Sequence, residues 1–194
     1  TVLGYILNFS RNLSFMTEAM REGEWKKIPG KALHECSLGV IGVGNVGESV
    51  LRKARAFGMQ LYATDIKKIP SDIVVELAIN EVSLEELLKV SDYISVNCDL
   101  NETSFHLINK QTLSKMKRSA VVINTARGPI IDERALIDAL EKGVIGGAAL
   151  DVFEEEPLPL SSPLLKMKNV MVAPHNSNSS PFSWEFIHTN TINN

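Results

Sequence analysis

The chain has 194 residues, of which 44% are hydrophobic and 22% are charged, and these values are typical of one globular domain. Its formal net charge of −3, with lysines and arginines scattered along the sequence, excludes the basic surface that nucleic acid would need. Apolar runs fall short of the roughly 18 residues of a membrane helix, so we expect no membrane contact. Cys36 and Cys98 are too few for a disulfide framework, and we expect a reducing, cytoplasmic location.

Residues 1–21 carry apolar side chains at approximately helical spacing, which predicts one helix. Gly23 and Pro29-Gly30 end the pattern, so residues 1–30 are expected to form a helix and a linker. Because this helix precedes the first strand, we expect an arm outside the core sheet. The chain opens on threonine and ends in mid-pattern, and we expect it to be part of a longer protein.

Short apolar runs then alternate with helical patterns. The predicted strands are 38–42, 60–64, 93–97, 120–124, 147–150 and 169–173, with a weaker one near residue 78. The predicted helices are 46–57, 109–116 and 132–142, and Ser83 with Glu86 forms a capping-box pattern before another short helix. This order predicts an α/β fold of Rossmann type: a doubly wound, mostly parallel sheet with helices on both faces. We expect this core over residues 36–175 and the start of a C-terminal helix over 182–194.

A glycine-rich turn, Gly42-Val-Gly44-Asn-Val-Gly47, joins the first predicted strand to the next helix. The motif alone is weak evidence, but a strand before it and a helix after it match the dinucleotide-binding fingerprint. Gly42 would form the tight turn, Gly44 would let a pyrophosphate approach, and Gly47 would let the helix pack against the sheet. The helix start at Asn45-Val46 would offer free N–H groups to the phosphates. The alternative is a structural turn without a ligand.

Asp65 lies at the end of the second predicted strand, close to the roughly 20-residue spacing that the fingerprint expects. A carboxylate there can accept hydrogen bonds from both ribose hydroxyls of NAD, and its charge would repel the 2′-phosphate of NADP. Lys67 and Lys68 are close enough to reach that phosphate and to soften the preference. The alternative is that Asp65 only forms a turn. The sequence therefore predicts NAD as the cofactor.

An arginine follows a later strand, in the segment Asn124-Thr-Ala-Arg127-Gly128. Since the strand is predicted to be buried, Arg127 should emerge at the ligand-binding edge of the sheet. Its planar, always-charged guanidinium suits the carboxylate of a substrate. The alternative is an arginine in a surface ion pair.

Two more polar segments follow strands, Asp151-Val-Phe-Glu-Glu-Glu156-Pro157 and Val172-Ala-Pro-His175. A run of three glutamates is usually a solvated surface, and composition alone does not choose among them. A histidine after proline is often structural. Its position at a strand end, together with Arg127 and the acidic run, favours a catalytic role.

Together, these motifs closely resemble the nucleotide-binding domain of the D-isomer-specific 2-hydroxyacid dehydrogenases, the family of phosphoglycerate, glycerate, D-lactate and formate dehydrogenases. The resemblance covers essentially the whole chain and includes Leu100 to Asn109, Asn124 to Asp132, Gly147 to Pro157 and Asn169 to His175. It departs after His175, where the family has a small apolar residue and glycines and this chain has Asn176-Ser177-Asn178.

The resemblance implies catalytic roles for Arg127, Glu156 and His175. His175 would be the general acid/base at the substrate carbonyl, Glu156 would orient its imidazole, and Arg127 would hold the substrate carboxylate. Asp151 matches the position that holds the nicotinamide carboxamide. The cofactor-binding set as a whole is Gly42, Gly44, Asn45, Val46, Gly47, Asp65, Asn97, Cys98, Thr103, Thr125, Ala126, Arg127, Asp151 and His175, and no residue is assigned to a metal.

The resemblance implies an NAD-dependent oxidoreductase that transfers hydride between NAD(H) and a small 2-hydroxy or 2-keto acid whose identity the sequence does not give. In the family the substrate domain comes from segments before and after this one, so we expect the isolated chain to bind NAD and to turn over poorly. In the family the region of the N-terminal helix helps to build a two-fold dimer, so we expect a homodimer; the alternative is that this helix packs only on its own domain. Alternatives are a non-catalytic, NAD-sensing regulator of the corepressor type and a related NAD-using hydrolase, against which the Arg-Glu-His order speaks.

Overall fold

The computed structural model describes residues 1–179 of the chain. The helix expected over residues 182–194 lies outside these residues. Within the described part, no helix combines the length and apolar character that crossing a membrane requires.

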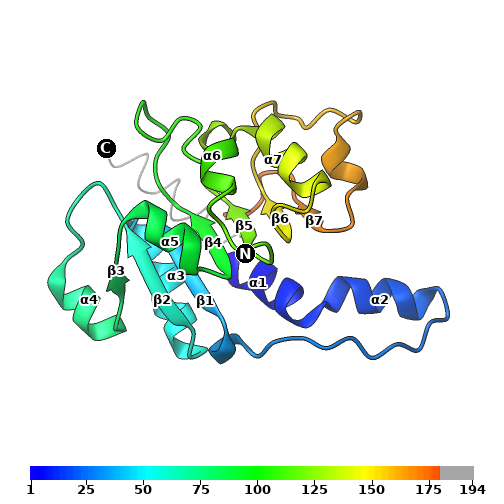
Figure 1. The fold of residues 1–194 in the computed structure, drawn as a ribbon, viewed down its shortest axis with the longest axis horizontal. Helices are drawn as coiled ribbons and strands as arrows, with labels where there is room; N and C mark the ends of the chain where they lie inside the picture. Colours follow the sequence, from blue (N-terminus) through cyan, green and yellow to red (C-terminus); the bar gives the residue numbers. More distant parts are fainter. Residues whose placement is uncertain (180–194) are drawn as a thin grey trace.

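Seven strands form one sheet in the order β3-β2-β1-β4-β5-β6-β7, and every described neighbour pair runs parallel (Figure 1). The strands are β1 (Ser37–Ile41), β2 (Gln60–Thr64), β3 (Asn80–Glu81), β4 (Tyr93–Val96), β5 (Val121–Asn124), β6 (Gly147–Leu150) and β7 (Val170–Val172). The direction of winding reverses between β1 and β4, and ligands of such sheets bind at this switch point, outside the carboxyl ends of the strands.

Helices cover both faces of the sheet, which confirms the predicted doubly wound fold. They are α3 (Asn45–Ala56), α4 (Ser71–Leu77), α5 (Leu84–Val90), α6 (Lys110–Leu113) and α7 (Glu133–Glu141), with 3₁₀ turns at Leu33–Glu35, Gly128–Ile130 and Pro163–Lys166. One apolar core lies between one face of the sheet and the helices α3 and α4. A second core lies between the opposite face and the helices α5, α6 and α7. The strands β1, β4, β5 and β6 are buried along their whole length, because a parallel sheet with two covered faces needs continuous apolar runs.

The N-terminal segment differs from the single arm helix that the sequence predicts. It forms two helices, α1 (Val2–Arg11) and α2 (Leu13–Arg21), separated by Asn12 in the left-handed conformation with φ 54°. α1 is not an arm, because Val2, Tyr5 and Ile6 are buried in the first core. Periodicity shows that a helix has an apolar face but not what that face packs against.

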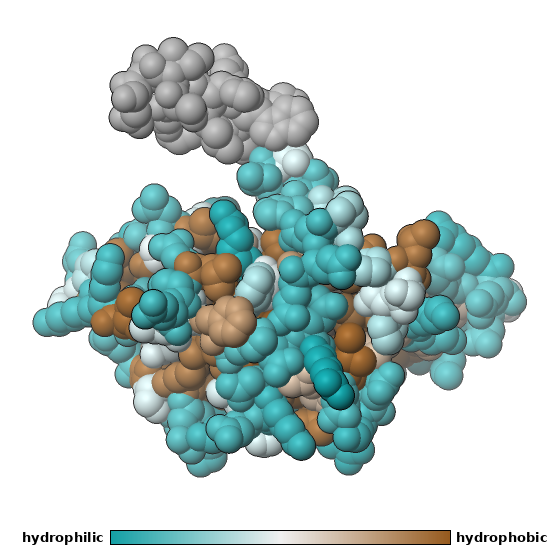
Figure 2. All heavy atoms as spheres, turned by 90° about the horizontal axis from the view of Figure 1, so that it is seen from above, coloured by the Kyte–Doolittle hydropathy of each residue, from teal (hydrophilic) through white to brown (hydrophobic). Residues whose placement is uncertain are grey.

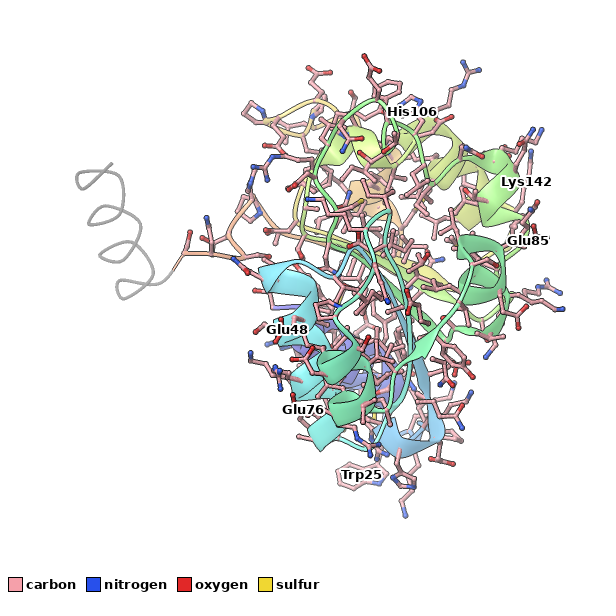
Figure 3. The ribbon with its side chains drawn as sticks, turned by 90° about the vertical axis from the view of Figure 1, so that its left-hand side faces the viewer. Trp25, Glu48, Glu76, Glu85, His106 and Lys142 are labelled. Carbon is pink, nitrogen blue, oxygen red and sulfur yellow. The ribbon has the colours of Figure 1, made fainter. Side chains whose placement is uncertain are left out.

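Only α2 and the chain that returns from it extend away from the body as an arm (Figure 1). Its side chains Leu13, Phe15 and Met20 are each about half exposed, at 47%, 51% and 52%. Trp25, on the return segment, is 83% exposed and projects outward at the end of the molecule opposite His106 (Figure 3). On the face seen in Figure 2, hydrophobic side chains gather in several patches between hydrophilic ones.

A second difference lies near residue 78, where the sequence suggests a weak strand. Ala78 instead ends α4 in the left-handed conformation with φ 51°, and β3 is only two residues long. The helix escapes prediction because Ile73, Val74 and Val75 are β-branched, and such residues favour strands. The predicted cap of α5 is present, since the Ser83 hydroxyl accepts a hydrogen bond from the Glu86 amide at 3.2 Å.

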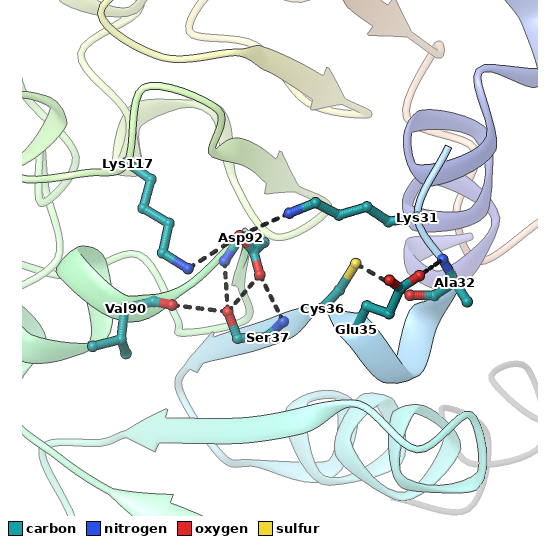
Figure 4. Close-up of polar contacts among 8 residues, drawn as sticks. All are labelled: Lys31, Ala32, Glu35, Cys36, Ser37, Val90, Asp92 and Lys117. Atoms are coloured by element: carbon teal, nitrogen blue, oxygen red, sulfur yellow. Dashed lines mark hydrogen bonds and ion pairs between the residues drawn. The ribbon is translucent and has the colours of Figure 1, made fainter. Parts of the chain in front are cut away.

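A polar cluster centred on Asp92 ties several segments together at the amino end of the sheet (Figure 4). The Asp92 carboxylate accepts hydrogen bonds from the Ser37 amide at 2.9 Å and the Ser37 hydroxyl at 2.8 Å. It also pairs with Lys117 at 3.0 Å and more loosely with Lys31 at 3.9 Å. Burial raises the pKa of Asp92, but the hydrogen bonds from Ser37 and Lys117 outweigh burial and lower this pKa below its usual value.

Candidate cofactor-binding and active site

The three glycines of the motif are required for different reasons. Gly42 has φ +90°, and a Cβ there would lie 2.7 Å from the Cys98 amide nitrogen. A Cβ on Gly47 would clash with the carbonyl oxygen of Gly42. Gly44 has φ −83°, and a Cβ there would meet no atom within 4 Å. The fold therefore needs glycine at positions 42 and 47, whereas at position 44 only a ligand would need it.

A cleft of about 890 Å³ runs past this loop at the carboxyl edge of the sheet. Among the residues expected to bind the cofactor, it is lined by Gly42, Gly44, Asn45, Val46, Asp65, Asn97, Cys98 and Thr103. Lys67 and Lys68 line it too. Gly47 lies behind the loop in the first turn of α3, and that helix begins at the cleft with its N-terminus.

Asp65 ties the glycine loop to the end of β2. One carboxylate oxygen accepts a hydrogen bond from the Val43 amide at 2.6 Å, and the other accepts one from the Lys67 amide at 2.8 Å. Each oxygen has a second lone pair, so the carboxylate can still accept from a ligand. Asp65 is thus a turn former that also lines the cleft.

A smaller cleft of about 340 Å³ continues from the first, and both share Val46, Asn97, Cys98 and Asp99. It adds Thr125, Ala126 and Arg127, which follow β5. Burial, and to a lesser extent the charges of Asp99 and Asp65, raise the pKa of Cys98, so its thiol stays protonated at neutral pH.

Arg127 is exposed, and its Nη1 donates a hydrogen bond to the Ala126 carbonyl at 2.7 Å. No ion pair within residues 1–179 includes it. The turn that carries it is shaped by the buried Asn124, whose side chain accepts from the Ala126 amide at 3.0 Å and donates to the Arg127 carbonyl at 2.9 Å. Asn124 was not predicted to have a role; its signal in the sequence is a polar amide directly at the end of an apolar strand.

Of the three consecutive glutamates, Glu156 is the one that lies beside His175. The His175 Nδ1 and the Glu156 Oε2 are 2.9 Å apart, and the Glu156 Oε1 accepts a hydrogen bond from the Phe153 amide at 3.0 Å. Glu154 instead contacts His106, at 2.6 Å. Burial raises the pKa of Glu156, but the hydrogen bonds from His175 and Phe153 outweigh it and lower this pKa, so the carboxylate is charged at neutral pH.

The structure does not place Arg127 and His175 in one cleft. His175 and Glu156 line a separate, largely apolar cleft of about 580 Å³ with Pro157, Leu158 and Leu165 among its walls. The two segments nevertheless touch, because a Cβ on Gly128 would clash with the Phe153 carbonyl. The turn that carries Arg127 therefore packs directly against the turn that carries Glu156.

Asp151 is only 1% exposed and lines none of these clefts. Its two carboxylate oxygens accept hydrogen bonds from the amides of Asn176 and Ser177, each at 2.8 Å. The polar residues after His175 are thus joined to Asp151 through their main chain.

The fold and the cleft at its switch point define a dinucleotide-binding domain. The family model described as "D-isomer specific 2-hydroxyacid dehydrogenase, NAD binding domain" matches residues 3–177. The chain belongs to this NAD-binding family, and the resemblance drawn from its motifs is confirmed.

Relatives of known name support this assignment. The chain is 42% identical over 168 residues to a glyoxylate reductase of Korarchaeum cryptofilum, covering 83% of the chain and 50% of that protein. It is 39% identical over 181 residues to a D-3-phosphoglycerate dehydrogenase of Methanocaldococcus jannaschii, covering 92% of the chain and 34% of that protein. The chain thus spans half or less of the length of these curated relatives.

Solved structures agree with the sequence relatives. A D-lactate dehydrogenase from Aquifex aeolicus, complexed with NAD and lactic acid, is 30% identical with a TM-score of 0.91, covering 99% of the chain and 62% of that structure. Another relative, from Xanthobacter autotrophicus, was solved with NADPH; it is 34% identical with a TM-score of 0.82, covering 90% of the chain and 55% of that structure.

Proposed function

We propose that this chain is the cofactor-binding half of a dehydrogenase that interconverts small 2-hydroxy and 2-keto acids. The observation that carries the proposal is the Glu156–His175 pair, at 2.9 Å, on the same edge of the sheet as the glycine loop. All described strands are parallel, so the ends of β1 and β7 meet at one edge although they are far apart in the sequence.

The residues around the larger cleft fit NAD. The open space above Gly44 admits a pyrophosphate, and the N-terminus of α3 offers it unpaired amides and the positive end of the helix dipole. Asp65 has lone pairs left for the ribose hydroxyls. When bound, the nicotinamide supplies or accepts the hydride.

His175 is suited to proton transfer because, within residues 1–179, only one of its ring nitrogens has a hydrogen-bond partner. Nδ1 bonds to the charged Glu156, which orients the ring. Nε2 is left to give a proton to the substrate carbonyl oxygen and to remove it in the reverse direction. Arg127 would bind the substrate carboxylate with its planar guanidinium.

The proposal is tested by measuring NADH binding and the reduction of glyoxylate, hydroxypyruvate and pyruvate by the 194-residue chain. We expect binding, with turnover at least about a hundredfold below the roughly 10 s⁻¹ of a typical enzyme, because the family's substrate site needs a second domain. His175→Gln should abolish any remaining turnover and leave NADH binding within about twofold. Robust turnover by the chain, or residual turnover unchanged in the variant, would contradict the proposal.

We also propose a cytoplasmic homodimer in which two α2 arms pair. Half-exposed Leu13, Phe15 and Met20 on an extended arm support this, since apolar groups on an arm gain free energy when a partner covers them. Sedimentation equilibrium should give a dimer, and Phe15→Glu combined with Met20→Glu should give a monomer. Lys26→Glu, on the return segment, is the matched charge control. A monomeric wild-type chain at about 100 µM would exclude this arrangement.

A further inference from the structure

Three main-chain amides, from His175 to Ser177, converge on Asp151. The His175 amide donates to the Asp151 main-chain carbonyl at 2.8 Å, and the next two amides donate to the two carboxylate oxygens at 2.8 Å each. His175 itself has φ +51°, a left-handed conformation that a residue with a side chain keeps only where its surroundings impose it. The three bonds to Asp151 hold the main chain at this residue and directly after it.

We call Asp151 and the three amides that it binds the Asp151 clamp, and the first turns of α1 lie against it. The Thr1 hydroxyl donates to the Ser177 carbonyl at 3.4 Å, and Tyr5 follows one turn later on the same face of the helix. Tyr5 is 7% exposed. Burial raises the pKa of Tyr5, and the negative charge of Asp151 raises it further. The phenol therefore keeps its proton at neutral pH.

Packing alone does not explain why residue 5 carries a hydroxyl group. Tyr5 Oη and Ser177 Oγ are both buried and form no hydrogen bond with any residue of the described part. Burying such a hydroxyl is unfavourable, and a phenylalanine ring would fill the same space without the penalty. Each Asp151 oxygen has a lone pair left, and since no direct bond forms, the carboxylate is the acceptor available to the phenol through one bridging water.

We propose that Tyr5 is a positioning residue for His175: its hydroxyl supports the Asp151 carboxylate, and through it α1 holds the main chain at the histidine in place. The functional meaning of this clamp rests on the proposed role of His175 as the general acid/base. A reacting group displaced by about 1 Å loses roughly a hundredfold in rate, so a rigid support for this segment matters to the reaction.

The clamp is tested by amide hydrogen exchange, followed by NMR on the 194-residue chain without cofactor. In Tyr5→Phe the amides of Asn176 and Ser177 should exchange about tenfold faster, and the imidazole signals of His175 should shift. Asp151→Asn should release the same two amides more strongly. The matched control is Tyr62→Phe, which removes the hydroxyl of a partly buried phenol on β2 that packs in the second core, apart from the first core that holds α1, and should change neither.

A measurement on the unaltered chain gives a second test. The Tyr5 hydroxyl proton should appear as a slowly exchanging resonance that is lost in Tyr5→Phe. Unchanged exchange at Asn176 and Ser177 in Tyr5→Phe, or no such hydroxyl resonance in the wild type, would overturn the proposal. These measurements are made without cofactor, so they can support the clamp even if the chain does not bind NAD. They can also contradict the clamp while the proposed function holds.

Discussion

The role of an acidic residue in this chain is decided by what its carboxylate contacts. Composition did not choose among three consecutive glutamates, and the family resemblance selected the one before Pro157. In the structure Glu156 lies beside His175, whereas Glu154 lies beside His106. The choice depends on how the turn after β6 folds back on itself, with the Phe153 amide bonded to Glu156, and no local sequence pattern encodes that.

The Glu156–His175 bond should depend on pH in a defined direction. The pKa of Glu156 is lowered in the folded chain, so the bond's contribution is complete above the ordinary glutamate pKa of about 4.3 and is lost as pH falls through the lower, folded value. His175 imidazole signals followed by NMR should therefore show an acid transition below about pH 4.3. Glu156→Gln should remove this transition and Glu155→Gln should not. A transition that survives in Glu156→Gln would contradict the assignment.

Asp65 should set both the affinity for NAD and the discrimination against NADP. Asp65→Asn removes the charge and one acceptor, and hydrogen bonds to charged groups contribute about 1.5–3 kcal/mol. We expect the Kd for NAD to rise roughly tenfold or more and the preference over NADP to shrink, since Lys67 and Lys68 line the same cleft. Calorimetric titration with both cofactors measures this. Asp72→Asn, in the first turn of α4, is the control, and an unchanged Kd in Asp65→Asn would contradict the role.

At the scale of elements, the strands were predictable and the helices only partly so. Fully buried strands such as β1 and β5 are continuous apolar runs, which the sequence displays directly. The burial of α1 was not predictable, because an apolar helix face fits the sheet as well as a partner subunit. The convergence of the amides from His175 to Ser177 on Asp151 was likewise hidden, because it joins segments that meet only in the folded chain.

The Asp92 cluster should stabilise the fold at neutral pH and stop doing so in acid. The pKa of the Asp92 carboxyl is lowered in the folded chain. The stabilisation is therefore present above the ordinary aspartate pKa of about 3.9 and is lost as pH falls through the folded value. Asp92→Asn should lower the free energy of unfolding by about 1–3 kcal/mol at pH 7. Urea unfolding at pH 7 and at pH 3 measures this. A deficit that is equally large at pH 3 would show that the charge is not responsible.

At the scale of the whole molecule, the topology explains why a site could be assembled from scattered motifs. The glycine loop follows β1, the Arg127 turn follows β5, Asp151 follows β6 and His175 follows β7, and parallel strands bring all four to one edge. The sequence did not reveal that Arg127 and His175 line separate clefts. The chain covers 50% and 34% of two of its relatives, and we propose that a second domain completes a substrate site between the two clefts.

We infer that the open space above Gly44 serves a ligand and is not needed by the fold. Calorimetric titration of NAD into the wild-type chain and Gly44→Ala tests it most directly. The added methyl group meets no protein atom within 4 Å, so the free energy of unfolding should change by less than about 1 kcal/mol, in line with its exposed position. We predict one NAD bound per wild-type chain and at least a roughly tenfold weaker affinity in Gly44→Ala. A wild-type chain that binds no NAD, or a folded Gly44→Ala that binds it equally well, would contradict the account.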